Sequence, residues 1–186
     1  MTKKKVLLFG STGGLGTEIK KKLCKKYKVF CTNKAKINFN KKNSSTKIFK
    51  LLKSANPDII INCSGILGNN KMTYQRVFNI NLGSNWDIIR FYINNKNKIN
   101  KKILIILIGS TAYKSGKKNY LLYSASKSAL HNLYEGSKLM MKNSKIKILI
   151  YHPERMKTKM VQNIKYIKKK MGSSPILVAE KICNLI

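Results

Sequence analysis

Short apolar runs alternate with amphipathic stretches along the chain. Six runs have the length and composition of β-strands, and the most apolar of them covers residues 102–108. Between the first two runs, Leu15, Ile19 and Leu23 recur at the four-residue spacing of a helix face. The strand-like runs are residues 5–9, 27–32, 35–39, 58–62, 102–108 and 145–151. Strands that alternate with helices predict an α/β protein with a parallel sheet.

Five segments are predicted to be helices. They are residues 15–26, 44–54, 73–95, 121–142 and 175–185. The order of the elements predicts a doubly wound, Rossmann-like sheet of about six strands, with helices on both faces. We expect residues 1–186 to form one domain, because a chain of this length can bury one ordinary core.

Composition narrows the class of protein. Hydrophobic residues make up 43% of the chain, which excludes a disordered basic tail. The longest apolar run is far shorter than the roughly 18 residues of a membrane span, and the start of the chain lacks the apolar core of a signal peptide. Four scattered cysteines suggest no disulfide framework. These features predict a cytoplasmic protein that does not bind a membrane.

The net charge of +33 raises the alternative of a nucleic-acid-binding protein. Its lysines are spread along the whole chain, however, and only three basic residues are arginines, the side chain that reads base edges best. Lysine, asparagine and isoleucine share A/T-rich codons, so a biased genome explains this composition. Nucleic acid is therefore not the partner that we expect.

A glycine-rich turn joins the first strand to the first helix. It reads Gly10-Ser11-Thr12-Gly13-Gly14-Leu15-Gly16. Glycines allow a sharp turn and a close approach of backbone N–H groups to a pyrophosphate, and the start of a helix favours negative charge. The position of this cluster predicts a dinucleotide-binding site.

Tyr123 and Lys127 are four residues apart on a predicted helix and share one face. A lysine ammonium beside a phenol stabilises the phenolate and lowers its pKa from about 10. Ser110 follows the most apolar strand, at the edge where open α/β sheets bind their ligands.

Six motifs in this order resemble the short-chain dehydrogenase/reductase family. The glycine turn fits G-x-x-x-G-x-G, and Asn62-Cys63-Ser64-Gly65 stands where the family has N-N-A-G. Asn81, Ser110 and Tyr123-x-x-x-Lys127 match the catalytic tetrad, and the segment from Pro153 to Thr158 fits P-G-x-x-x-T. The region after Thr158 is short for the family.

The resemblance implies an NAD(P)-dependent oxidoreductase that acts on a carbonyl or secondary alcohol. Tyr123 would be the acid/base, Ser110 would hydrogen-bond the carbonyl oxygen, Lys127 would lower the tyrosine pKa and hold the ribose, and Asn81 would hold a water. The residues implied in cofactor binding are Gly10, Ser11, Thr12, Gly14, Leu15, Gly16, Asn33, Lys34, Asn38, Phe39, Cys63, Ser64, Gly65, Tyr123, Lys127, Pro153 and Thr158.

Cofactor choice depends on the end of the second strand. No carboxylate is present there to hold the ribose of NAD, and Lys34 is available for the 2′-phosphate of NADP. We expect NADP, with NAD as the alternative. No metal site is expected, and we interpret His131 and His152 as packing or surface residues.

The departures from the family leave other possibilities open. Asn38 stands where an aspartate often contacts adenine, and Glu154 replaces the glycine of P-G. The short end of the chain predicts an open substrate cleft or one completed by a partner, and the resemblance implies a homodimer or homotetramer. A dinucleotide-binding protein without turnover and a nucleotide-sugar reductase or epimerase remain alternatives to the oxidoreductase.

Overall fold

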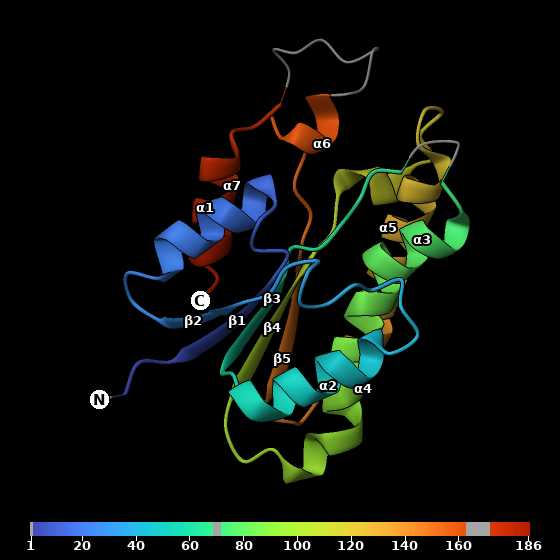
Figure 1. The fold of residues 1–186 in the computed structure, drawn as a ribbon. Helices are drawn as coiled ribbons and strands as arrows, with labels where there is room; N and C mark the ends of the chain where they lie inside the picture. Colours follow the sequence, from blue (N-terminus) through green and yellow to red (C-terminus); the bar gives the residue numbers. More distant parts are fainter. Residues whose placement is uncertain (1, 69–71, 163–171) are drawn as a thin grey trace.

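A five-stranded parallel sheet forms the centre of the protein (Figure 1). The computed structural model describes residues 2–68, 72–162 and 172–186. The strands are β1 (Lys5–Phe9), β2 (Lys28–Cys31), β3 (Ile59–Asn62), β4 (Ile103–Ile108) and β5 (Ile146–Tyr151), and their order in the sheet is β2-β1-β3-β4-β5. β1 and β3 are almost wholly apolar because they are covered on both faces.

Helices cover both faces of this sheet. They are α1 (Gly14–Leu23), α2 (Ser44–Ala55), α3 (Tyr74–Phe78), α4 (Ser84–Asn95), α5 (Leu121–Met140), α6 (Lys159–Gln162) and α7 (Pro175–Cys183). α1 and α7 pack on one face, and α2, α4 and α5 pack on the other (Figure 1). The predicted doubly wound α/β fold is confirmed. None of the helices described is long and apolar enough to span a membrane.

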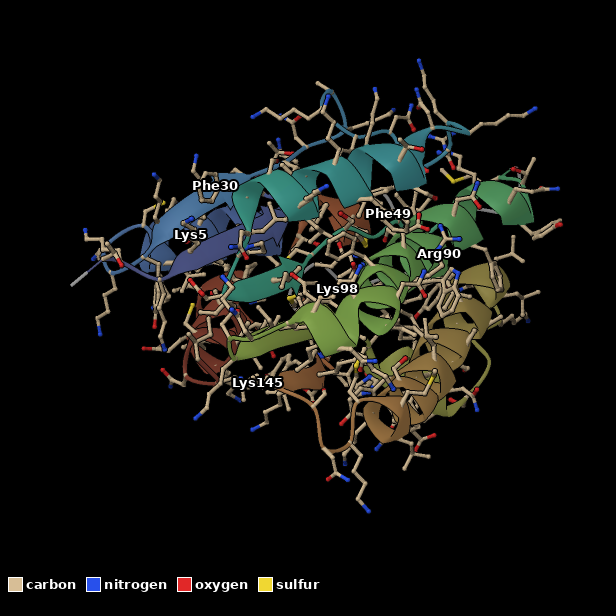
Figure 2. All side chains as sticks on the ribbon, turned by 90° about the horizontal axis from the view of Figure 1, so that it is seen from below. Lys5, Phe30, Phe49, Arg90, Lys98 and Lys145 are labelled. Carbon is tan, nitrogen blue, oxygen red and sulfur yellow. The ribbon has the colours of Figure 1, made fainter. Side chains whose placement is uncertain are left out.

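Each face has its own hydrophobic core. Alternate residues of β1 point to opposite sides, so Leu7 joins the core under α2 and α4, whereas Leu8 joins the core under α1 and α7. On the first face Phe49 of α2 packs against Phe91 of α4, and the Arg90 guanidinium lies over the Phe49 ring, 5.0 Å from its centroid (Figure 2). These contacts fix the sheet relative to the helices that carry the polar residues described below.

After β1 the chain forms β2 on one side of β1 and then crosses over to form β3 on the other side. β2 pairs with one edge of β1 and β3 with the opposite edge, so the strand order reverses between β1 and β3. In open parallel sheets, a crevice outside the carboxyl ends of the strands forms at such a reversal. The glycine turn follows β1 at this point.

The strand predicted at residues 35–39 is wrong. The side-chain oxygen of Asn33 accepts hydrogen bonds from the N–H groups of Ala35 and Lys36, and Ile37 N donates to Asn33 O. This asparagine turn closes the chain on itself and leaves no extended segment to pair. The apolar alternation of this run instead places Ile37 in the core under α2.

The long helix predicted at residues 73–95 contains a wider turn in its middle. Residues Asn79–Gly83 form a π-helix between α3 and α4. Ser84 Oγ donates to Ile80 O at 2.7 Å, and Asn85 Nδ2 donates to Asn81 O at 2.9 Å. Side-chain donors that bond carbonyls four residues back compete with the regular helical ladder, and π-turns of this kind occur often at functional sites.

Candidate active site

The glycine turn lies at the switch point of the sheet, between β1 and the start of α1. Gly10 has a φ of +70°, and a Cβ atom there would lie 2.7 Å from the backbone nitrogen of Ser64. Both the left-handed conformation and this close approach to the end of β3 require glycine. The turn therefore has its shape because Gly10 has no side chain.

Two further glycines shape the start of α1. A Cβ on Gly16 would lie 2.2 Å from Gly10 O, so the helix can begin this close to the strand only with glycine. A Cβ on Gly14 would lie 2.9 Å from the Thr158 methyl group, which places Thr158 over the helix start. The first N–H groups of a helix have no partners within the helix and attract anions.

The end of β2 is tied to the glycine turn. Ser11 donates to Thr32 O from its backbone nitrogen at 3.2 Å and from its hydroxyl at 3.0 Å. Lys34 is exposed two residues beyond this contact, and the Asn33 side-chain oxygen is used by its own turn. The structure thus brings Lys34 to the end of the strand that borders the turn, as the sequence predicts.

Ser110 lies directly after β4. Its hydroxyl caps the short 3-10 helix Thr111–Lys114 by accepting a hydrogen bond from Ala112 N at 3.2 Å. The backbone on either side continues along the end of β5, since Gly109 N donates to Tyr151 O and Thr111 N donates to Pro153 O. Ser110 is consequently held at the carboxyl edge of the sheet.

Tyr123 and Lys127 lie on successive turns of α5, as their spacing predicts. Lys127 is 3% exposed, and its Nζ atom donates to Ile108 O at 2.8 Å and lies 5.7 Å from the centre of the Tyr123 ring. Burial lowers the pKa of Lys127 to about 8, and the charge of Cys63 acts in the opposite direction. A lysine this deeply buried is costly to the fold, which is a frequent property of functional groups.

The pKa of Tyr123 is shifted upward, whereas the sequence predicts that Lys127 lowers it. Burial raises it above its ordinary value, hydrogen bonding with Ser110 lowers it in part, and the charge of Tyr120 adds to the rise. The Lys127 ammonium donates to Ile108 O and lies 5.7 Å from the centre of the Tyr123 ring. In this structure the Tyr123 phenol is protonated at neutral pH, ready to donate a proton.

Asn81 lies behind the site in the π-turn. It is fully buried; its Oδ1 accepts from Ile66 N, and its Nδ2 donates to Ile66 O and Ser126 Oγ. Ser126 in turn donates to Tyr123 O, and the Asn81 carbonyl accepts from Asn85. This network connects the loop after β3 to α5, so here Asn81 positions other groups and does not face the cavity.

One cavity of about 490 Å³ connects the glycine turn with Ser110, Tyr123 and Lys127. The predicted site residues that line it are Thr12, Gly14, Leu15, Gly16, Cys63, Ser64, Gly65, Ser110, Tyr123, Lys127, Pro153 and Thr158. The remaining predicted residues, which do not line it, are Gly10, Ser11, Asn33, Lys34, Asn38, Phe39 and Asn81. Twelve residues from the ends of four strands and from two helices thus converge, although they are distant in sequence.

The cavity also has walls that the sequence did not indicate. Leu67, Ala112 and Met160 give it apolar surface, and Tyr120 lies one helical turn before Tyr123 with the two ring centres 5.9 Å apart. Only the start of a helix at residue 121 could have indicated Tyr120. The expected open cleft depends partly on residues 163–171, which lie outside the described residues.

Comparison with known proteins agrees with this geometry. Residues 38–168 match the model of the family described as short chain dehydrogenase. The chain belongs to this family of NAD(P)-dependent oxidoreductases. The matched region contains Ser110, Tyr123 and Lys127, and the glycine turn precedes it.

This short-chain dehydrogenase has a curated relative of known activity. The 3-oxoacyl-[acyl-carrier-protein] reductase FabG of Buchnera aphidicola is 30% identical over 217 aligned residues, which cover 99% of this chain and 88% of that protein. The alignment includes the elements that carry the cavity, from β1 to α7.

Solved structures share the fold of this short-chain dehydrogenase at lower identity. The 3-alpha-hydroxysteroid dehydrogenase of Pseudomonas sp., complexed with NADH, superposes with a TM-score of 0.84 at 15% identity. The match covers 98% of this chain and 89% of the chain of that dehydrogenase. A short chain dehydrogenase of Burkholderia cenocepacia in complex with NADP has a TM-score of 0.79 at 16% identity, and the match covers 96% of this chain and 82% of that chain. These similarities concern the fold.

Proposed function

We propose that this protein reduces a carbonyl group to a secondary alcohol with NADPH, with Tyr123 as the proton donor. The observation that carries the proposal is the shared cavity: Ser110, Tyr123 and Lys127 face the same space as the glycine turn. A bound nicotinamide dinucleotide would supply the hydride. The remaining chemistry is the movement of one proton and the stabilisation of charge on one oxygen.

Tyr123 suits proton donation. Its raised pKa keeps the phenol protonated at neutral pH, and Ser110 lines the same cavity. As negative charge develops on the carbonyl oxygen, Ser110 and Tyr123 can both donate hydrogen bonds to it. The same raised pKa leaves little phenolate at neutral pH, so little of the enzyme is in the form that can accept a proton in the oxidative direction.

Lys127 is suited to hold sugar hydroxyls. An ammonium group has three N–H donors, and the bond to Ile108 O uses one of them. Among the described residues the other two have no assigned acceptor, although the group is buried next to the cavity. Ribose hydroxyls at this position would satisfy them.

The glycine turn fits a pyrophosphate, and its shape supports the choice of a dinucleotide. Glycine is sterically required at Gly10 and Gly16, and the start of α1 opens on the cavity. Thr158 lies over the same helix start. Lys34 at the end of β2 supplies a positive charge for a 2′-phosphate, which favours NADPH over NADH.

The surface charge does not favour the nucleic-acid alternative. Lys5, Lys98 and Lys145 lie around the amino-terminal edge of the sheet in the view from below (Figure 2). Lys34 and Lys117 lie at the opposite, carboxyl edge. Within residues 2–68, 72–162 and 172–186, these lysines lie at both ends of the molecule and do not form a single stripe that would follow a phosphate backbone.

The test is the oxidation of NADPH and NADH with a panel of ketones, 3-oxoacyl thioesters and keto-sugars. The panel includes 3-oxoacyl thioesters because the FabG relative is named for that substrate class. We expect turnover with at least one class and a loss of about tenfold to 100-fold in kcat for Ser110→Ala. Ser115→Ala, in the exposed segment after Ser110, is the matched control and should keep the wild-type rate. Tight NADPH binding without turnover of any compound would favour the non-catalytic alternative.

A further inference from the structure

Two histidines far apart in sequence form a pair behind Ser110. His131 lies on α5 and His152 follows β5, and His131 Nδ1 is 3.1 Å from His152 Nε2. The Tyr113 ring lies against both, with its centre 4.2 Å from each imidazole. At the far end of the pair, His131 Nε2 is 3.7 Å from the exposed Glu135 carboxylate. The cluster therefore extends from the back of the site to the surface.

The near end of this cluster contacts the backbone of Ser110. His152 Nδ1 lies 3.2 Å from Ser110 N and 3.2 Å from Ser110 O. The neighbouring amides of Gly109 and Thr111 donate to backbone carbonyls of the β5 segment. The Ser110 amide differs from these two amides, because its acceptor is the His152 side chain and not a backbone carbonyl.

The imidazole is fixed in place by the residue before Ser110. A Cβ atom on Gly109 would lie 2.3 Å from His152 Nδ1 and 2.6 Å from Cε1. The ring thus packs directly on the Gly109 backbone, and only glycine leaves room for it. Gly109, Ser110 and His152 form one interlocked unit.

One arrangement of protons gives Ser110 N an acceptor and gives each imidazole N–H a partner. If His152 Nδ1 accepts the Ser110 N–H, the neutral ring carries its proton on Nε2 and donates it to His131 Nδ1. His131 then carries its own proton on Nε2, facing Glu135. Protonation of His152 at Nδ1 would remove the acceptor from Ser110 N and leave Ser110 O as the only backbone partner.

We infer that His152, in its neutral form and backed by His131, is a positioning residue that holds the Ser110 backbone so that the serine hydroxyl faces Tyr123. This inference rests on the proposed reaction for its effect on rate. His152 does not line the cavity, so it acts through Ser110 and does not touch the substrate.

The groups around His152 favour its neutral form. Burial lowers the pKa of His152, the Ser110 backbone contact raises it, and the positive charges of Lys127 and Lys114 lower it further, with His131 acting in the same direction. On the other side, His152 borders a second cavity that Glu154, Glu180 and Lys181 also line. The net effect is a pKa below the ordinary value, so the ring is neutral at pH 7.

The experiment compares two substitutions of similar size. His152→Asn keeps an oxygen that can accept the Ser110 N–H but cannot titrate, whereas His152→Leu offers no acceptor. We expect His152→Leu to lower kcat about tenfold at neutral pH, with the KM for NADPH unchanged, because an unsatisfied amide lets Ser110 shift. His152→Asn should recover most of the rate and lack the acid limb that wild type shows below its His152 pKa.

A second readout does not depend on turnover. In ¹⁵N-serine-labelled wild-type protein, the Ser110 amide resonance should titrate with a midpoint below the ordinary histidine pKa, and it should not titrate in His152→Asn. In the control His131→Gln the titration should persist, because His152 itself contacts the Ser110 backbone. A Ser110 resonance that ignores pH in wild type, or a His152→Leu enzyme with the wild-type kcat, would overturn the inference.

The two readouts separate this inference from the proposed reaction. If no carbonyl compound is reduced while the Ser110 amide titrates with His152, the reaction is wrong and the control of Ser110 by His152 stands. If reduction depends on Tyr123 while the amide does not respond, only the inference fails.

Discussion

The Nζ atom of Lys127 lies 2.8 Å from the carbonyl oxygen of Ile108, the last residue of the strand that leads to Ser110. This contact joins the middle of α5 to the carboxyl edge of the sheet. It therefore fixes Tyr123, one helical turn earlier, relative to Ser110. The contact also requires an ammonium group to be almost completely removed from water, which has a measurable effect on stability.

The stability of the fold should depend on Lys127 in a defined pH window. Its pKa is about 8 in the folded protein and 10.5 ordinarily, so the unfolded chain binds more protons between these values and stability rises with pH there. Below about pH 8 the full cost of burial is present. We expect Lys127→Met to be more stable than wild type by about 2 kcal/mol at neutral pH. The difference, measured by urea denaturation, should shrink toward pH 10.5; a constant difference would contradict the assigned pKa.

The buried amide of Asn85 should contribute strongly to stability. Asn85 is 2% exposed, its Oδ1 accepts from Asn62 Nδ2, and its Nδ2 donates to Asn81 O. Asn85→Ala leaves both partners without this bond and should lower the free energy of unfolding by about 2 to 3 kcal/mol. Asn95→Ala is the matched control, because Asn95 makes the same contact to Phe91 O at the half-buried end of α4. We expect that control to cost under about 1 kcal/mol; equal losses would show that the network has no special weight.

Two glycines of the turn, Gly10 and Gly13, should respond differently to one added methyl group. Gly10→Ala must adopt a φ of +70° and insert Cβ 2.7 Å from Ser64 N, so it should destabilise the protein by at least about 2 kcal/mol and abolish NADPH binding. Gly13 has a φ of −74°, and its Cβ would find its nearest neighbour at 3.4 Å. Gly13→Ala should therefore change stability by less than about 0.5 kcal/mol. Thermal unfolding measures the change in stability, and a fluorescence titration measures NADPH binding. Equal stability and equal NADPH binding in the two variants would contradict the proposed role of Gly10 in the turn.

Cofactor preference should depend on Lys34. Lys34→Glu replaces the charge proposed to meet the 2′-phosphate, so the Kd for NADPH should rise about tenfold while that for NADH changes little. Lys36→Glu makes the same charge change two residues away on the same exposed turn and should affect both cofactors slightly. If the two variants weaken NADPH binding equally, the effect is one of overall charge, and Lys34 has no specific role.

Sequence alone predicted the elements whose pattern is set by burial on one sheet. The apolar runs at β3 and β4 and the spacing of Leu15, Ile19 and Leu23 on α1 place the core correctly, because these side chains meet the sheet directly. The segment at residues 35–39 has strand-like alternation, but the turn made by the Asn33 side chain decides its conformation. A local side-chain hydrogen bond of this kind has little signal in a hydrophobic pattern.

The sequence predicted the local motifs of the candidate site, but not the contacts that form only in the folded protein. The turn at Gly10–Gly16 and the pair of Tyr123 and Lys127 are local motifs, and the structure brings both to one cavity. The direction of the Tyr123 pKa shift depends on burial, which is a property of the folded protein. The contact of His152 with Ser110 joins residues 42 positions apart, so sequence spacing could not indicate it.

The most direct measurement of the central claim compares kcat for Tyr123→Phe with that for Tyr120→Phe, with NADPH and the best carbonyl substrate. Both tyrosines line the cavity with ring centres 5.9 Å apart, and both substitutions remove one hydroxyl. If Tyr123 gives the proton, its variant should lose about 100-fold or more in kcat at an unchanged Kd for NADPH, and the Tyr120 variant should lose less than about threefold. Undiminished turnover by Tyr123→Phe, or equal losses in the two variants, would contradict the assignment.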